Sequence, residues 1–277
     1  MERKTLLTYC PDAKGLIAQI TNICYKHQLN IILNREFVDH DSGQFFMRTE
    51  LEGYFNDHTF LLDIDRTLPQ GSYRKLVDSR RKRIVIMVTK ESHCLGDILM
   101  KAFDGSLDVD IAAVVGNYDT LQALTEKFDI PYHHVSHEGL SREEHEQAML
   151  SVISQYEPDY IILAKYMRVL TENFVAQFPA RIINIHHSFL PAFIGARPYH
   201  QAWVRGVKII GATAHFVTND LDEGPIIGQH VIPVDHTFSA EDMAKSGRDV
   251  EKQVLSKALG MVLEDRVFVW GNKTVIL

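Results

Sequence analysis

The chain has 277 residues, of which 45% are hydrophobic and 23% are charged, and its formal net charge is −7 at pH 7. This length exceeds what one hydrophobic core usually serves, so two domains are expected. The acidic balance gives no support to a nucleic-acid partner, and the lack of a signal-peptide pattern or a long apolar run predicts a cytoplasmic protein without a membrane association.

Residues 1–79 have the pattern of a small βαββαβ domain. Strands are predicted at 6–9, 31–38, 44–51 and 73–77, and helices from residue 16 onward and at 58–65. The first helix has one apolar face, formed by Leu16, Ile20, Ile23 and Cys24. Strand 44–51 alternates, so that Phe45, Met47, Thr49 and Leu51 share one side. The Asp-Ser-Gly run at 41–43 supplies a hairpin turn. This order predicts a ferredoxin-like antiparallel sheet with two helices on one face.

A second domain is predicted over residues 84–277, after a basic linker at 80–83. The Arg-Arg-Lys-Arg run of the linker is interpreted as a solvated joint rather than a phosphate-binding patch. Helices are predicted at 93–103, 121–128, 141–156 and 171–178, and strands at 84–88, 109–115, 132–135, 160–163 and 182–186. Alternating strands and helices indicate an α/β fold with a doubly wound, mostly parallel sheet. Such sheets bind ligands outside the carboxyl ends of their strands.

The strand at 182–186 ends with two polar side chains. Asn184 and His186 are two residues apart, so they point to the same side of the strand. An amide donor and an imidazole directed at one point can stabilise a developing oxyanion. Alternatively, both side chains only satisfy backbone groups of the loop that follows.

Three acidic residues crowd the turn at 218–225, which ends in Gly224-Pro225. Crowded carboxylates raise one another's pKa, so one of them could act as a base near neutral pH. The alternative is a surface turn in which the acidic residues serve backbone geometry alone.

The Asn-Ile-His strand followed by Asp222-Glu-Gly-Pro resembles the formyltransferase-type folate enzymes, and further similar segments lie at 163–170, 190–191 and 211–217. The resemblance covers residues 84–277. It implies that Asn184, His186 and Asp222 are catalytic. It also implies that the folate lies among Met167, Arg168, Leu170, Asn219, Asp220 and Leu221.

The chain is more similar to the hydrolytic members of this family. The doubled His186-His187 and the segments 195–202 and 247–251 carry that likeness. It implies hydrolysis of 10-formyltetrahydrofolate to formate and tetrahydrofolate in one-carbon and purine metabolism, without a tightly bound cofactor. Asp222 would activate the water, and Asn184 and His186 would stabilise the tetrahedral intermediate. Possible further lining residues are His187, Gly195 and His215.

The first domain resembles an ACT regulatory domain, through Cys10-Pro11-Asp12 and Gly15-Leu16. That likeness implies amino-acid effectors, methionine and glycine, with a possible effector site at Asp12, Gly15 and Asn34. Lys14 stands where ACT domains have proline. The domain could instead only pair subunits edge to edge, and a homo-oligomer (a dimer or tetramer) is expected.

Two other functions remain open from the sequence. One is formyl transfer to glycinamide ribonucleotide, but loop 89–95 has no glycine to cradle a phosphate and carries the opposing charge of Glu91. The other is a non-enzymatic folate or amino-acid sensor. No metal site is expected, because the fourteen histidines include no His-Glu-x-x-His pattern and the cysteines lack zinc-site spacing.

Overall fold

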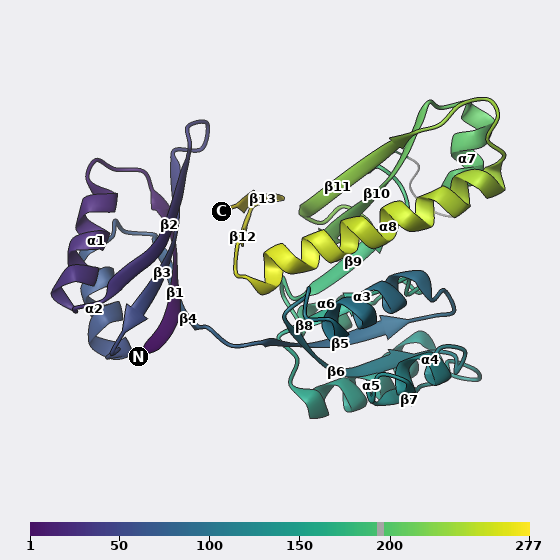
Figure 1. Ribbon diagram of the computed structural model, residues 1–277, viewed down its shortest axis with the longest axis horizontal. Helices are drawn as coiled ribbons and strands as arrows, with labels where there is room; N and C mark the ends of the chain where they lie inside the picture. The colour runs from purple at the N-terminus through teal and green to yellow at the C-terminus, as the bar shows by residue number, and fades with distance from the viewer. Residues whose placement is uncertain (193–196) are drawn as a thin grey trace. The chain divides into compact units, whose positions relative to one another are not determined.

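The computed structural model describes residues 1–192 and 197–277 (Figure 1). The chain divides into two compact units. The first comprises Met1–Arg80, Asp265–Phe268 and Val275–Leu277, and the second comprises Arg81–Glu264 and Val269–Thr274. Parts of the last segment thus pack with the first unit, although chain order suggested the second. No helix in the described ranges is both long and apolar enough to cross a bilayer.

The first unit has the predicted βαββαβ order. Its elements are β1 (Glu2–Pro11), α1 (Leu16–Lys26), β2 (Asn30–Asp39), β3 (Gln44–Gly53), α2 (Asp57–Thr67) and β4 (Tyr73–Asp78). The strands form one antiparallel sheet in the order β2-β3-β1-β4. The four apolar residues predicted for the inner face of α1 are all buried. They form one core with Leu6, Phe45, Met47, Phe60 and Ile64.

Strand β3 is buried on both faces, which its alternation did not predict. Phe46 is 0% exposed and Arg48 is 5% exposed, although both lie on the face away from the helices. The ring of Phe46 packs edge-on against Phe268, and Nε of Arg48 donates to the carbonyl oxygen of Asp265 at 3.1 Å. The segment Asp265–Phe268 therefore covers this face of the sheet.

The second unit alternates strands and helices. Its elements are β5 (Lys82–Val88), α3 (His93–Phe103), β6 (Val109–Gly116), α4 (Gln122–Glu126), β7 (Tyr132–His134), α5 (Arg142–Ile153), the 3-10 turn η1 (Ser154–Tyr156), β8 (Tyr160–Leu163), α6 (Glu172–Ala176), β9 (Ile182–His186), α7 (Pro198–Arg205), β10 (Ile209–Phe216), β11 (Ile226–Pro233) and α8 (Ala240–Leu263). The short strands β12 (Val267–Trp270) and β13 (Lys273–Ile276) pair with each other. Lys82 and Arg83, expected in the linker, belong to β5 because they pair with β6.

Seven strands of this unit form one sheet in the order β11-β10-β9-β8-β5-β6-β7 (Figure 1). The pairs from β9 to β7 are parallel, and β10 and β11 extend the sheet as antiparallel strands. This confirms the doubly wound, mostly parallel sheet. Strand β10 runs antiparallel to β9. The strand that carries Asn184 and His186 therefore lies beside β10, which comes later in the chain.

Helices cover both faces of this sheet. On one face, Val85 and Met87 of β5 pack with residues of α5 and α6, including Met149, Ile153 and Phe174. On the other face, α8 contacts α3, β9, β10 and β11. The start of α5 is set by local chemistry, because Ser141 and Glu144 form the predicted capping box. Strand β9 therefore lies inside the sheet, between β8 and β10, with helices on both faces.

Candidate active site

A cavity of about 1090 Å³, including its open mouth, lies where β8, β9 and β10 meet the acidic turn. It is lined by the three residues with predicted catalytic roles and by all six predicted folate contacts: Asn184, His186, Asp222, Met167, Arg168, Leu170, Asn219, Asp220 and Leu221. His187 and His215 also line it. We call it the main cavity. The structure thus gathers residues from three separate stretches of sequence around one space.

Four polar side chains form the floor of the main cavity, and we call them the His186–Asp222 group: Asn184, His186, His215 and Asp222. The two antiparallel strands β9 and β10 place His215 directly opposite Asn184. Nδ1 of His186 lies 3.3 Å from Oδ2 of Asp222, and Nε2 of His215 lies 3.8 Å from Oδ1 of Asp222. Nε2 of His186 is buried and has no hydrogen-bond partner among the described residues. Buried polar atoms are normally paired, so this group is incomplete without a ligand or water.

The hydrogen-bond partners assign the tautomer of His215. Its Nδ1 lies 2.9 Å from the carbonyl oxygen of Phe216, which can only accept, so Nδ1 carries the hydrogen. Nε2 then accepts from the amide Nδ2 of Asn184 at 3.2 Å. Burial lowers the pKa of His215, more than the backbone contact and the charge of Asp222 raise it, in agreement with this neutral form. His215 therefore orients the Asn184 amide and leaves its second N–H available.

The carboxyl group of Asp222 is ionised at neutral pH. Burial raises its pKa, but the hydrogen bond and the electrostatic interaction with His186 are the main causes that outweigh burial, and its pKa lies below the ordinary value. The crowding of the acidic turn predicted the opposite direction. The difference arises because histidines, rather than the other acidic residues, face Asp222. An ionised carboxylate can accept a proton from water.

The turn that carries Asp222 is held against the end of β10. The amide N of Phe216 donates to the carbonyl oxygen of Pro225 at 2.9 Å. A Cβ atom at Gly224 would lie 1.8 Å from the carbonyl oxygen of Phe216, so only glycine permits this approach. Asp222 itself has a left-handed backbone with φ 58°. Its side chain is thereby folded back toward the histidines.

The upper walls of the main cavity are largely apolar. Met167 is 56% exposed and Leu221 is 52% exposed, although both line the cavity. The loop that carries Met167 is anchored at its end, where the buried carboxylate of Glu146 accepts from the amide N of Thr171 at 2.8 Å. On the opposite wall, the amide of Asn219 donates to Glu172 at 3.1 Å. Exposed apolar side chains on anchored loops suit a flat, partly apolar ligand.

A second polar group was not predicted from the sequence, and we call it the Lys165–Glu251 group: His93, Lys165, Tyr199 and Glu251. Oη of Tyr199 donates to Oε1 of Glu251 at 2.7 Å. Nε2 of His93 lies 2.7 Å and Nζ of Lys165 lies 3.3 Å from Oε2 of Glu251. Burial raises the pKa of Glu251, but these donors together hold it at about 2. Gly247 makes the arrangement possible, because a Cβ atom there would lie 2.0 Å from Oη of Tyr199.

This second group borders an adjoining cavity of about 970 Å³, including its open mouth. Lys165, Met167 and His187 line both cavities and form the wall between them. His93, Cys94 and Glu251 bring possible metal-ligand atoms within 4.8 Å of one another. However, Glu251 already faces the ammonium of Lys165, whose charge opposes a metal ion at the same oxygen. The group is therefore described as an ion pair with hydrogen bonds.

The remaining residues with predicted roles are distributed as follows. Gly195 lies outside the described residues. In the first unit, Asp12 is exposed, Gly15 begins α1 with φ 86°, and Asn34 on β2 accepts from Oγ1 of Thr49 at 2.7 Å. Sequence reasoning gave Lys165 no role, although a charged residue just after the buried strand β8 is an unusual feature. The strand and helix periodicities of the sequence could not link Lys165 to Glu251, because Glu251 lies in α8, far along the chain.

Comparison with known proteins gives consistent results. A family model described as formyl transferase matches residues 82–259, and one described as ACT domain matches residues 4–62. A formyltetrahydrofolate deformylase from Escherichia coli O6:H1 is 70% identical over 277 residues, covering 100% of this chain and 99% of that protein. The crystal structure of a formyltetrahydrofolate deformylase from Pseudomonas syringae pv. tomato is 40% identical with a TM-score of 0.94, covering 100% of this chain and 95% of that one. The crystal structure of a glycinamide ribonucleotide transformylase from Symbiobacterium toebii is 30% identical with a TM-score of 0.70, covering 73% of this chain and 96% of that one.

Proposed function

This chain belongs to the formyl transferase family and, within it, to the formyltetrahydrofolate deformylases, which hydrolyse 10-formyltetrahydrofolate, and we propose that Asn184, His186 and Asp222 carry out this hydrolysis. The observation that carries the assignment is the position of His186 and Asp222, 3.3 Å apart on the floor of the main cavity. The products are formate and tetrahydrofolate.

The proposed mechanism begins with a water molecule beside Asp222. The ionised carboxylate removes a proton from the water as its oxygen attacks the formyl carbon. The free N–H of Asn184 and the imidazole of His186 stabilise the negative oxygen of the tetrahedral intermediate. The proton taken by Asp222 then passes to N10 of the folate, directly or through His186, because an amine leaves poorly as an anion. These steps use only water, the substrate and side chains of the chain.

The folate is proposed to bind along the upper walls of the main cavity. Met167, Leu170 and Leu221 offer apolar surface to the flat ring system, and Arg168 offers a cation at the edge. The backbone of the acidic turn, from Asn219 to Leu221, offers hydrogen-bonding groups to the ring. This arrangement presents the formyl group to the floor of the cavity.

Hydrolysis is favoured over formyl transfer by the pairing of the buried cation of the adjoining cavity. An acceptor such as glycinamide ribonucleotide carries a phosphate. The adjoining cavity is lined by three carboxylates (Glu91, Glu241 and Glu251) and three cations (Lys165, Arg197 and Arg248), but Nζ of the buried Lys165 lies 4.0 Å from Oε1 of Glu91 and 3.3 Å from Oε2 of Glu251. Glu91 and Glu251 thus partly neutralise the buried cation that a phosphate would need. Water can take the place that an acceptor amine would occupy.

The ACT domain is proposed to sense amino acids, with methionine and glycine as effectors at Asp12, Gly15 and Asn34. A homo-oligomer, a dimer or a tetramer, is proposed as the assembled form. Support for the effector site comes from two features: Asp12 is exposed, and Gly15, which precedes α1, has a left-handed backbone conformation. Control of this kind suits an enzyme that would otherwise drain a formyl-folate pool.

The decisive experiment is to incubate the protein with 10-formyltetrahydrofolate and no amine acceptor, and to measure formate and tetrahydrofolate. We expect steady release, and a loss of on the order of a hundredfold or more in the Asp222→Asn variant. Turnover only after addition of glycinamide ribonucleotide would instead identify a transformylase. Near-normal turnover of Asp222→Asn would remove Asp222 from the mechanism.

A further inference from the structure

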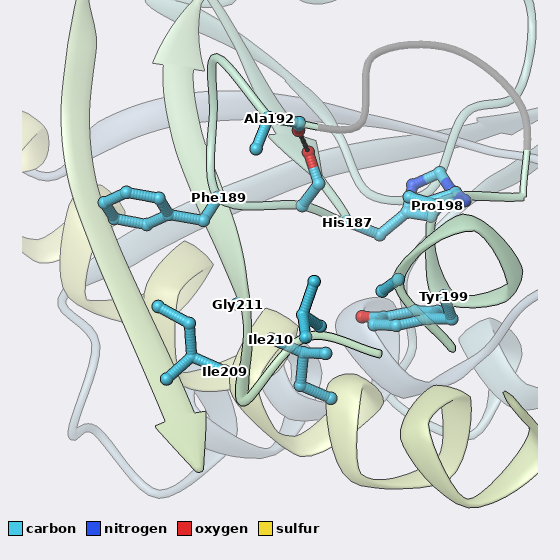
Figure 2. Close-up of a pocket in the computed structure, with 11 residues that line it drawn as sticks. His187, Phe189, Ala192, Pro198, Tyr199, Ile209, Ile210 and Gly211 are labelled. Carbon is cyan, nitrogen blue, oxygen red and sulfur yellow. Dashed lines mark hydrogen bonds between the residues drawn. The ribbon is translucent and has the colours of Figure 1, made fainter. Parts of the chain in front are cut away.

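His187 lies at the junction of the two cavities. It follows the last residue of β9, and its ring lines the main cavity, the adjoining cavity and a smaller apolar pocket that it borders together with Tyr199 (Figure 2). The centroid of its ring lies 5.3 Å from that of His186 and 6.0 Å from that of Tyr199. Within a regular strand, adjacent residues such as His186 and His187 would point in opposite directions. Because β9 ends at His186, the chain turns there and the two rings lie side by side.

His187 makes no hydrogen bond to any described residue, in contrast to most of the polar side chains around it. His186 faces Asp222 at 3.3 Å, and Tyr199 donates to Glu251 at 2.7 Å. An imidazole with free nitrogens on the wall between two cavities can accept a proton on one side and release it on the other. Its neighbours on each side are already engaged with other partners.

The reaction itself leaves one proton to be removed. Water supplies two protons, of which one ends on N10 of the folate and the other stays on the newly formed formic acid. A carboxylic acid of ordinary pKa ionises near neutral pH, so each turnover yields formate and one proton. This step takes place on the floor of the main cavity, where the proposed position of the folate is between the formic acid and the open mouth.

We propose that His187 accepts this proton from formic acid and releases it into the adjoining cavity. The inference rests on the proposed function of the main cavity. The O–H bond of formic acid breaks, its electron pair stays on formate, and a ring nitrogen of neutral His187 becomes protonated. The imidazolium then gives the proton to water or to a buffer base in the adjoining cavity. His187 returns to its neutral form, and no oxidant, reductant or further reactant is needed.

The charges around His187 suit a group that binds a proton only briefly. Burial and, to a smaller extent, the cation of Lys165 lower the pKa of His187 to about 4, against the opposing charges of Glu251 and Asp222. A proton transfer from a carboxylic acid to such a ring is nearly balanced in free energy. The other ionisable groups that line the adjoining cavity are Glu91, Arg197, Tyr199, His200, Glu241 and Arg248. These side chains include both acidic and basic groups that can exchange a proton between His187 and the solvent.

The test is chemical rescue of the His187→Ala variant in weakly buffered solution. We expect kcat to fall on the order of a hundredfold, the low end of what a positioned proton-transfer group contributes, with KM for 10-formyltetrahydrofolate little changed. Added imidazole should restore kcat, and imidazoles of similar size should restore it in the order of their basicity. Pyrrole is the matched control, because it has the same shape without a basic nitrogen. His230→Ala, at an exposed position on β11, should behave as the wild type.

Three results would overturn the proposal. One is an unchanged kcat in His187→Ala. Another is rescue by pyrrole as well as by imidazole, which would indicate that His187 only fills space. The third is a loss that no base restores. The proposed function is judged separately, by formate release from the wild type without an acceptor, so its failure cannot be mistaken for a failure of the His187 proposal.

Discussion

The two polar groups of the second unit differ in how completely they are paired. In the Lys165–Glu251 group, the buried carboxylate has donors on both oxygens, at 2.7, 2.7 and 3.3 Å. In the His186–Asp222 group, the contacts of Asp222 are 3.3 and 3.8 Å, and Nε2 of His186 has no partner among the described residues. The carboxylate side chain is only 8% exposed in Asp222 and 1% exposed in Glu251, so burial does not separate the two groups. The incomplete pairing does, because it leaves hydrogen-bonding capacity that a substrate can use.

The comparison would be sharpened most by removing one donor from the incomplete group. We expect Asn184→Ala to lower kcat by about 10²- to 10³-fold, because a preorganised oxyanion donor is lost. KM should change little, since the amide acts on charge that develops only in the transition state. Steady-state kinetics of formate release measures both quantities. Asn173→Ala, at an exposed position on α6, is the matched control.

Removing a partner from the complete group should affect stability. Glu251→Ala leaves the ammonium of Lys165 buried without its main partner, and we expect a loss of about 3–5 kcal/mol in the free energy of unfolding. The double variant Lys165→Met with Glu251→Leu should recover part of it, because it removes the unpaired charge of Lys165 but still leaves Tyr199 and His93 without their acceptor. Urea unfolding followed by circular dichroism measures the difference. A loss in Glu251→Ala of less than about 1 kcal/mol would show that the pair is not a structural unit.

The smallest effect concerns the pH dependence of that stability. The pKa of Glu251 is lowered to about 2 in the folded protein, so its contribution is complete above the ordinary pKa of a glutamate and is lost as pH falls toward 2. The difference in unfolding free energy between the wild type and Glu251→Gln should therefore shrink on acidification. The slope for this one group is at most about 1.4 kcal/mol per pH unit. A difference that stays constant between about pH 5 and pH 3 would contradict the assigned ionisation.

Local pattern predicted the elements that carry the site. The helix His93–Phe103 and the strands Tyr160–Leu163 and Ile182–His186 have the predicted bounds, because each is a continuous apolar-patterned run with polar flanks. The side-by-side placement of Asn184 and His186 follows from the two-residue period of a strand. Asp222 was added by the family resemblance, and its position against His186 agrees with that expectation without testing its role.

Other features depend on contacts that no local pattern contains. Lys165 and Glu251 lie on different elements far apart in sequence, and only the folded sheet brings them together. The second buried face of β3 depends on Phe268, from the end of the chain. The direction of the Asp222 pKa shift was mispredicted for the same reason, since neighbours in space replace neighbours in sequence.

Two residues of these groups are held in a backbone conformation that their type disfavours. Asp222 has φ 58° and Lys165 has φ 62°, in the left-handed region. A residue with a Cβ atom there costs roughly 1 kcal/mol or more, although aspartate tolerates the region better than lysine does. Glycine at position 222 would relax the backbone and remove the proposed base. Folding stability alone would thus favour a different residue, and the role proposed for Asp222 implies a cost in stability at this position.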